Sequence, residues 1–218
     1  MATAHGTHDV DGVLVKARAR LASVNTYGRW PRAAALMTVP TWLAACAGRR
    51  WLAEDGHWVA GLALPILISH QTEEWVWPGG FLPFANQRVL GSDKPDWPLT
   101  VRDGFHLNVS IAWTSAVAGL LFWRRTPAPA ATVLWLEVGN VALHTGMALR
   151  KRRYNPGVAT AAFLMAPHAV ATVRWMRGSG RLSRRTGVAA AAAGLSITGL
   201  PLAMKVRMRR AARAAGQA

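Results

Sequence analysis

The chain has 218 residues, of which 51% are hydrophobic and only 17% charged, and its formal net charge is +16 at pH 7. This length fits a single domain, and the single cysteine, Cys46, excludes an intramolecular disulfide framework. Strongly basic chains can bind nucleic acid, but the basic residues here lie beside apolar segments, where they favour anionic lipid headgroups. We therefore expect no nucleic-acid partner.

The first 57 residues are predicted to form a polar N-terminal region with one short apolar segment. Residues 1–33 are polar and charged without an apolar core, so we expect no cleavable signal peptide. Residues 34–47 are apolar, but they are interrupted by Pro40 and are fewer than the ~20 residues needed to cross a bilayer. This segment is predicted to lie at the membrane interface or to form a half-helix.

The next part of the chain contains four apolar runs that approach the length of a membrane-spanning helix. Tryptophans near the ends of these runs are typical of the membrane–water interface. The prediction is an all-α polytopic bundle of transmembrane helices, in an integral protein of the bacterial cytoplasmic membrane. Four prolines in the connection after the first run predict an ordered loop outside the membrane. The four predicted core spans are residues 58–77, 105–123, 128–149 and 158–175.

Residues 176–218 are predicted to form a basic linker, a fifth span and a basic tail. The predicted fifth span, residues 187–204, is rich in alanine and glycine, which let transmembrane helices pack closely. The tail and the basic turn from Arg150 to Arg153 are expected to contact anionic lipid headgroups. That turn precedes the fourth span, and a helix N-terminus beside cations suits a phosphate or carboxylate.

Ionisable residues inside the apolar runs are the strongest functional signal in the sequence. Each costs roughly 2.5–3.5 kcal/mol on insertion scales, so such residues usually mark a site. Glu137 is the only acidic residue after Asp103, yet it lies within an apolar run. His70, Glu73 and Glu74 are spaced to share one helix face. The other polar candidates are Asn140 and His144 on the third run, His106 on the second and His168 on the fourth.

These side chains are predicted to form a metal site inside the bundle. If successive spans alternate in direction, a rise of ~1.5 Å per residue places them within a band of roughly 10–15 Å. Histidines and carboxylates on facing helices bind divalent metals in helical bundles, and the cation would offset the cost of burying the carboxylates. We expect zinc or iron. The predicted ligands are His70, Glu73, Glu74, Glu137, His144, His168 and His106, and the predicted catalytic residues are Glu73, Glu74 and Asn140.

The run His70-Gln71-Thr72-Glu73-Glu74 is similar to the motif that names the HXXEE-domain family of bacterial integral membrane proteins. Asn140-x-x-x-His144 and residues 154–160 also resemble later blocks of that family, so the resemblance covers about residues 58–175. It implies a membrane protein with a site around the motif, and it implies no particular reaction.

The predicted function is a membrane-embedded, metal-dependent enzyme, with hydrolysis of a lipid or other hydrophobic substrate preferred. Metal-bound water attacks at neutral pH, and a spare carboxylate of Glu73 or Glu74 would serve as general base. The set of paired glutamates, histidines and asparagine is similar to that of intramembrane CAAX-type proteases. It departs from theirs because Pro78 stands where their motif has arginine.

Several alternatives stay open at this point. One is a di-iron oxidase, although the membrane enzymes of that kind have metal clusters richer in histidine than this sequence offers. Another is a metal-independent isomerase of the sterol-isomerase type, in which Trp113 and Trp135 would help to stabilise a cation. A third is a transporter or lipid-binding protein with a buried Glu/His relay. In the simplest alternative, the polar residues only pack and satisfy backbone carbonyls.

Overall fold

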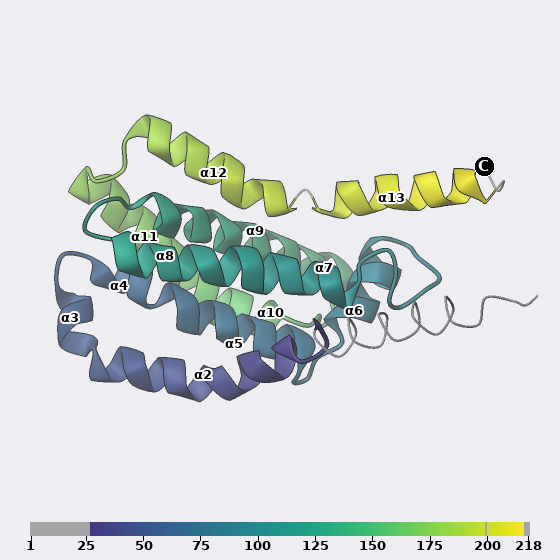
Figure 1. The fold of residues 1–218 in the computed structure, drawn as a ribbon, viewed down its shortest axis with the longest axis horizontal. Coiled ribbons are helices and arrows are strands. Elements are labelled where there is room, and N and C mark those ends of the chain that lie inside the picture. The colour runs from purple at the N-terminus through teal and green to yellow at the C-terminus, as the bar shows by residue number, and fades with distance from the viewer. Residues whose placement is uncertain (1–26, 199, 216–218) are drawn as a thin grey trace, which may run out of the picture.

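The computed structural model describes residues 27–198 and 200–215, and every regular element within these ranges is helical. The predicted all-α class is therefore confirmed, whereas the expectation about a signal peptide concerns residues that lie largely outside the described ranges. The main helices lie side by side in an elongated bundle (Figure 1). They are α2 (Trp30–Ala47), α5 (Ala63–Trp75), α8 (Thr114–Phe122), α9 (Ala128–Lys151), α11 (Ala166–Ser179) and α12 (Arg184–Thr198).

The remaining elements connect or extend these helices, and three of them are π-helical. The α-helical ones are α3 (Arg49–Ala53), α4 (His57–Gly61), α6 (Phe81–Pro83), α7 (Val101–Phe105), α10 (Val158–Thr160) and α13 (Leu200–Ala214). The π-helical ones are η1 (Phe84–Val89), η2 (His106–Trp113) and η3 (Ala161–Met165).

Helix α2 is longer than the apolar segment predicted at this position, and it continues through Pro40. Proline removes one helix hydrogen bond, but contacts with α5 hold α2 in place. The Thr38 and Thr72 hydroxyls lie 2.9 Å apart. The Trp42 indole donates a hydrogen bond to the Ser69 hydroxyl at 2.9 Å. The predicted half-helix is thus a complete helix that packs along α5.

The first predicted span is divided into α4 and α5, which meet at Leu62. Pro65 explains the position of this break, because it has no N–H to donate to the carbonyl of Gly61. Beyond α5, the connection is folded around the buried Asn86 side chain. Its amide donates to the carbonyls of Pro95 and Leu99, and its oxygen accepts from the Leu99 N–H, each at 2.9 Å.

Among the described residues, one helix is long and apolar enough to cross a membrane by length and composition. It is Val101–Phe122, formed by α7, η2 and α8, with 22 residues, and an 18-residue stretch of it has a mean hydropathy of 1.4. The second predicted span lies almost entirely within it. The predicted fifth span covers parts of α12, described to Thr198, and of α13, described from Leu200, and residue 199 between them lies outside the described residues.

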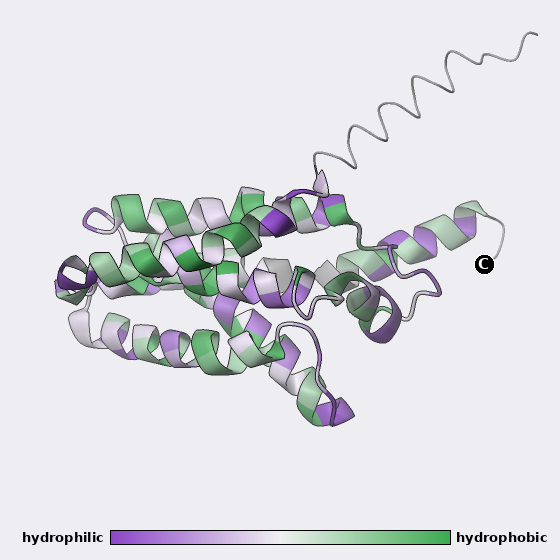
Figure 2. Ribbon diagram, turned by 90° about the horizontal axis from the view of Figure 1, so that it is seen from below, coloured by the Kyte–Doolittle hydropathy of each residue, from purple (hydrophilic) through white to green (hydrophobic). Residues whose placement is uncertain are grey.

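The interior of the bundle is apolar, but so is much of its outer surface. Figure 2 shows hydrophobic residues along the bundle helices, with many hydrophilic residues near the helix ends and along α13. Leu36 on α2, Leu121 on α8 and Phe163 on η3 are 78%, 71% and 78% exposed. Burying such side chains in an apolar environment is favourable. The helices therefore present apolar surface outward as well as inward.

Candidate metal centre

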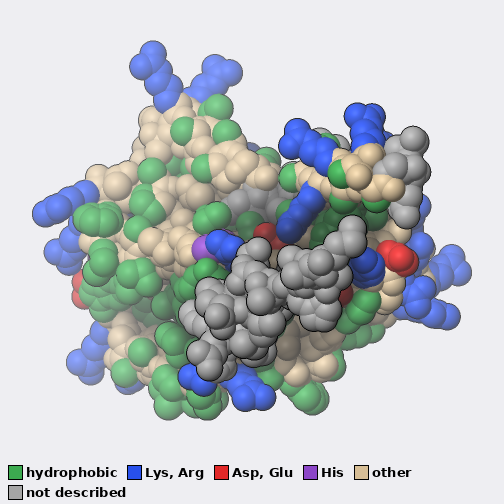
Figure 3. Space-filling model, turned by 45° about the vertical axis from the view of Figure 1, so that its right-hand side comes forward, with side chains coloured by type: hydrophobic (Ala, Val, Ile, Leu, Met, Phe, Trp, Pro, Cys, Tyr) green, Lys and Arg blue, Asp and Glu red, His purple; other side chains and the backbone are tan. Residues whose placement is uncertain are grey.

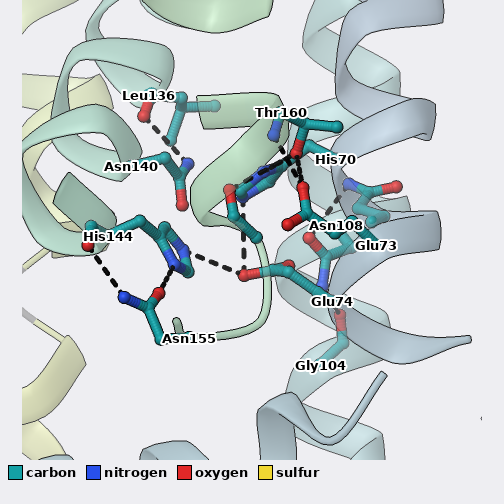
Figure 4. A network of polar contacts seen from close by, with 12 residues as sticks. His70, Glu73, Glu74, Gly104, Asn108, Leu136, Asn140, His144, Asn155 and Thr160 are labelled. Carbon is teal, nitrogen blue, oxygen red and sulfur yellow. Dashed lines mark hydrogen bonds and ion pairs between the residues drawn. The ribbon is translucent and has the colours of Figure 1, made fainter. Parts of the chain in front are cut away.

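Three buried side chains from two helices converge inside the bundle (Figure 4). His70 and Glu74 lie one turn apart on α5, and His144 comes from α9. One oxygen of Glu74, Oε1, lies 3.4 Å from His70 Nε2 and 3.2 Å from His144 Nε2. The candidate ligand atoms of the three residues all lie within 4.8 Å of one another. We call this group the triad.

The orientation of His144 is fixed by Asn155, which lies in the turn between α9 and α10. The Asn155 amide nitrogen donates to the carbonyl oxygen of His144 at 2.9 Å. The amide oxygen is therefore the atom 2.8 Å from His144 Nδ1, and it can only accept a hydrogen bond. His144 must carry a proton on Nδ1, which leaves the Nε2 lone pair of the neutral ring directed toward Glu74.

Thr160 fixes His70 in the same way. The Thr160 hydroxyl donates to Oε2 of the Glu73 carboxylate at 2.5 Å. Its oxygen is then free to accept a hydrogen bond from His70 Nδ1, at 2.9 Å. The neutral His70 ring also presents its Nε2 lone pair to the triad. Hydrogen bonds of this kind orient metal-binding histidines and raise their basicity.

Glu73 lies beside the triad but has a different role. Its carboxylate accepts hydrogen bonds from the Tyr154 hydroxyl at 2.9 Å and from the backbone N–H groups of Ala159 and Thr160 at 3.0 and 2.7 Å, besides the Thr160 hydroxyl. Burial and the hydrogen bond to Glu73 raise the pKa of Tyr154 above its usual range. Glu73 thus ties α5 to the start of α10, and the structure does not bring it into the triad.

The turn before α10 passes directly against the triad at Gly157. A Cβ atom at this position would lie 2.8 Å from Cε1 of both His70 and His144, and 3.0 Å from Cγ of Glu74. The backbone φ of Gly157 is +98°, which side chains other than hydrogen rarely allow. Only glycine lets the chain approach the two imidazoles this closely.

The triad has the chemistry of a divalent metal site. Nε2 of His70 and Nε2 of His144 are buried, and the atom that faces both of them is Oε1 of Glu74. Three acceptor atoms that face one another repel unless a proton or a cation lies between them. Tetrahedral sites with bonds of about 2.0–2.1 Å place neighbouring ligand atoms about 3.3–3.4 Å apart, close to the two contacts of Glu74. Two imidazoles and one carboxylate therefore fit such an ion.

Glu137 and His168 form a second buried pair. His168 Nδ1 lies 2.7 Å from Glu137 Oε2, and Glu137 Oε1 lacks a hydrogen-bond partner among the described residues. Glu137 interacts electrostatically with His70 but lies two turns before His144, roughly 10 Å along α9. The structure therefore separates the predicted single cluster into the triad and this pair.

His106 joins neither group. Its ring is exposed, lies 5.6 Å from the ring of Tyr27, and its Nδ1 is 3.4 Å from the Ser110 hydroxyl. The reason is helical geometry. Asn108, two residues later, faces inward and accepts a hydrogen bond from the Gln71 amide at 2.9 Å, and positions two apart point to different sides of a helix.

An apolar cavity of about 130 Å³ adjoins the triad. Glu74 and Asn140 contribute polar groups to its wall, and the Asn140 amide donates to the Leu136 carbonyl at 2.9 Å. Neither tryptophan of the predicted isomerase site lines it, because Trp113 donates to Gln71 and Trp135 packs against Gly194 of α12. Its apolar walls include Leu67, Phe81, Phe84, Leu107, Leu143 and Met204.

The sequence patterns did not assign roles to Asn155, Gly157 and Thr160, which hold the two imidazoles and make room for them. The available signal was the Asn-Pro-Gly turn followed by a threonine in the first turn of the next helix. Turn residues that carry function often lie in such connections. Their side-chain partners, however, are remote in sequence.

No curated protein and no solved structure matches the chain. A family model described as a protein of unknown function with an HXXEE motif matches residues 61–172, just over half of the 218 residues. Of the motif residues, His70 and Glu74 belong to the triad, and Glu73 provides the carboxylate that anchors α10. The chain belongs to this HXXEE family, as its motif predicted.

Proposed function

We propose that the protein is a membrane-embedded, metal-dependent enzyme that acts on a hydrophobic substrate, with hydrolysis of a lipid as the preferred reaction. The observation that carries this proposal is the triad. Two imidazoles are held in one tautomer by Asn155 and Thr160, and a carboxylate lies between their free nitrogens at the wall of an apolar cavity.

The residues of the site have distinct roles in this proposal. His70, His144 and Glu74 hold one divalent ion, zinc or iron. When bound, such an ion supplies an activated water at neutral pH. Asn140 lies one turn from His144 on the cavity wall and orients a polar group of the substrate. Glu73 is not the general base, because four donors already occupy its oxygens.

Two further observations support a location in the membrane, and two others bear on the alternative functions. The Val101–Phe122 helix is long and apolar enough to span a membrane, and other helices expose large apolar side chains. A single ion is favoured over a di-iron centre, because only one group of three potential ligands is found in the part of the chain that the structure describes. The isomerase alternative is disfavoured because Trp113 and Trp135 lie away from the cavity.

Metal analysis of protein purified in neutral detergent without chelators tests the proposal. We expect about one equivalent of zinc or iron in the wild type, and a loss of bound metal in His70→Ala, Glu74→Gln and His144→Ala. His106→Ala is the matched control, because this exposed histidine lies outside the triad, and it should retain the metal. Thermal unfolding of each variant separates loss of the site from loss of the fold.

Turnover of lipid esters by the same preparations provides the second readout. If Glu74→Gln retains metal but loses turnover, Glu74 acts on a proton and is not an essential ligand. A wild type that binds neither zinc nor iron, even on titration, would exclude the metal-dependent enzyme. The same conclusion follows if all three triad variants bind metal as the wild type does.

A further inference from the structure

A second pocket, of about 530 Å³, opens beside the triad and is strongly cationic. Arg88 of η1 and Lys151 and Arg153 at the end of α9 line it, and none of its lining residues is acidic. These three cations form no ion pair with any described residue. Figure 3, turned toward this end of the molecule, shows arginine and lysine side chains distributed over the surface. The pocket thus presents three exposed cations and no lining carboxylate.

Three lining residues connect this pocket to the triad and the apolar cavity. Tyr154 donates to Glu73, and Asn155 holds the His144 ring. Phe84 lines both the cationic pocket and the apolar cavity. The two spaces therefore share a lining residue, and Asn155, which orients His144, also lines the cationic pocket.

We propose that the substrate of this site is an anionic amphiphile, whose phosphate or carboxylate head binds Arg88, Lys151 and Arg153 while its apolar part enters the cavity beside Glu74. This inference rests on the proposed function and names its substrate class. Arginine matches the geometry of phosphate and carboxylate oxygens, and lysine adds a point charge. The neighbouring apolar walls select against small polar anions, because binding there gains from the burial of hydrocarbon.

The spacing also indicates which part of the substrate reacts. Lys151 lies two turns beyond His144 on the same face of α9, roughly 10 Å along the helix axis. We therefore assign the anionic head to recognition by the three cations and the reacting bond to the part of the substrate that enters the cavity beside Glu74.

Calorimetric titration with dodecyl phosphate and dodecanoate tests this inference on the full chain in neutral detergent. The test variant is the triple substitution Arg88→Gln, Lys151→Gln and Arg153→Gln. The matched control replaces Arg124, Arg125 and Arg185 by Gln; these exposed cations lie at the opposite end of the bundle (Figure 1). We expect the affinity for at least one of the two anionic probes to fall at least tenfold in the test variant and to change less than twofold in the control.

Two further arms identify the ligand. Inorganic phosphate should compete with dodecyl phosphate only weakly, because it gains nothing from the cavity; equal affinity would assign the pocket to free phosphate and overturn the proposal. Loss of affinity in both triple variants would show a general charge effect and would also overturn it. Metal content, measured in the same samples, tests the proposed function separately. If the protein binds the anionic probes specifically but contains no metal, the head-group pocket is supported and the proposed metal-dependent enzyme is rejected.

Discussion

Replacing Gly157 by alanine should disrupt the proposed metal site while leaving the rest of the bundle folded. The added Cβ would lie 2.8 Å from Cε1 of both His70 and His144. Restoring an ordinary carbon–carbon contact of about 3.6 Å requires each ring to move by about 0.8 Å. Functional sites tolerate errors of about 0.5 Å, so we expect metal affinity to fall at least 100-fold. Backbone strain and overpacking should lower the free energy of unfolding by about 2–5 kcal/mol.

Gly180→Ala provides the matched control, because Gly180 also has a positive φ, +65°, but a Cβ added there would meet no atom within 4 Å. It should cost about 1 kcal/mol of stability through strain alone and leave metal binding unchanged. Zinc titration against a competing chelator and thermal unfolding measure the two effects. If Gly157→Ala binds zinc as tightly as Gly180→Ala, the imidazoles do not need this close approach, and the geometric reasoning fails.

Two predictions concern the hydrogen bonds around the triad. Thr160→Val removes the acceptor of His70 Nδ1 and should weaken zinc binding 10- to 100-fold. Thr160→Ser keeps the hydroxyl, and the control Thr132→Val removes a hydroxyl that bonds to the Ala128 carbonyl, so neither should weaken zinc binding. Equal zinc affinities in all three variants would reject the role of Thr160. Tyr154→Phe should lower stability by about 1 kcal/mol through one lost bond to Glu73. Folding raises the pKa of Tyr154, so the wild type should be more stable than Tyr154→Phe at every pH below the unfolded-state pKa of 10.0, and this difference in stability should shrink as the pH rises further. A stability difference that disappears by pH 8 would contradict this.

The part of the site that could be predicted is the part that depends on local helix geometry. His70 and Glu74 are four residues apart on one helix, so their shared face was readable from the sequence. The same rule placed Glu137 and His144 on one face of α9, but it does not say which partner each meets across the bundle. His144 reaches Glu74, while Glu137 lies two turns away and pairs with His168.

The predicted helices followed from apolar runs, and the errors arose where local breaks decide the outcome. Apolar length alone predicted one continuous first span at residues 58–77, but the chain divides at Leu62 into α4 and α5. At Pro40 the sequence predicted an interruption that does not occur, because tertiary contacts with α5 keep α2 continuous. The roles of Asn155 and Thr160 depend on contacts with residues remote in sequence, which no local pattern contains.

The triad also has a consequence for how the protein folds. Glu74 and His144 are far apart in the chain, so a metal ion bound between them acts as a cross-link that exists only after α5 and α9 have docked. Binding to the native state alone adds RT ln(1 + [L]/Kd) to stability, about 2.7 kcal/mol at a hundredfold excess over Kd. The concentration of free metal in the cell would then set how firmly the two halves of the bundle hold together, and metal starvation would act on the abundance of the protein as well as on its activity.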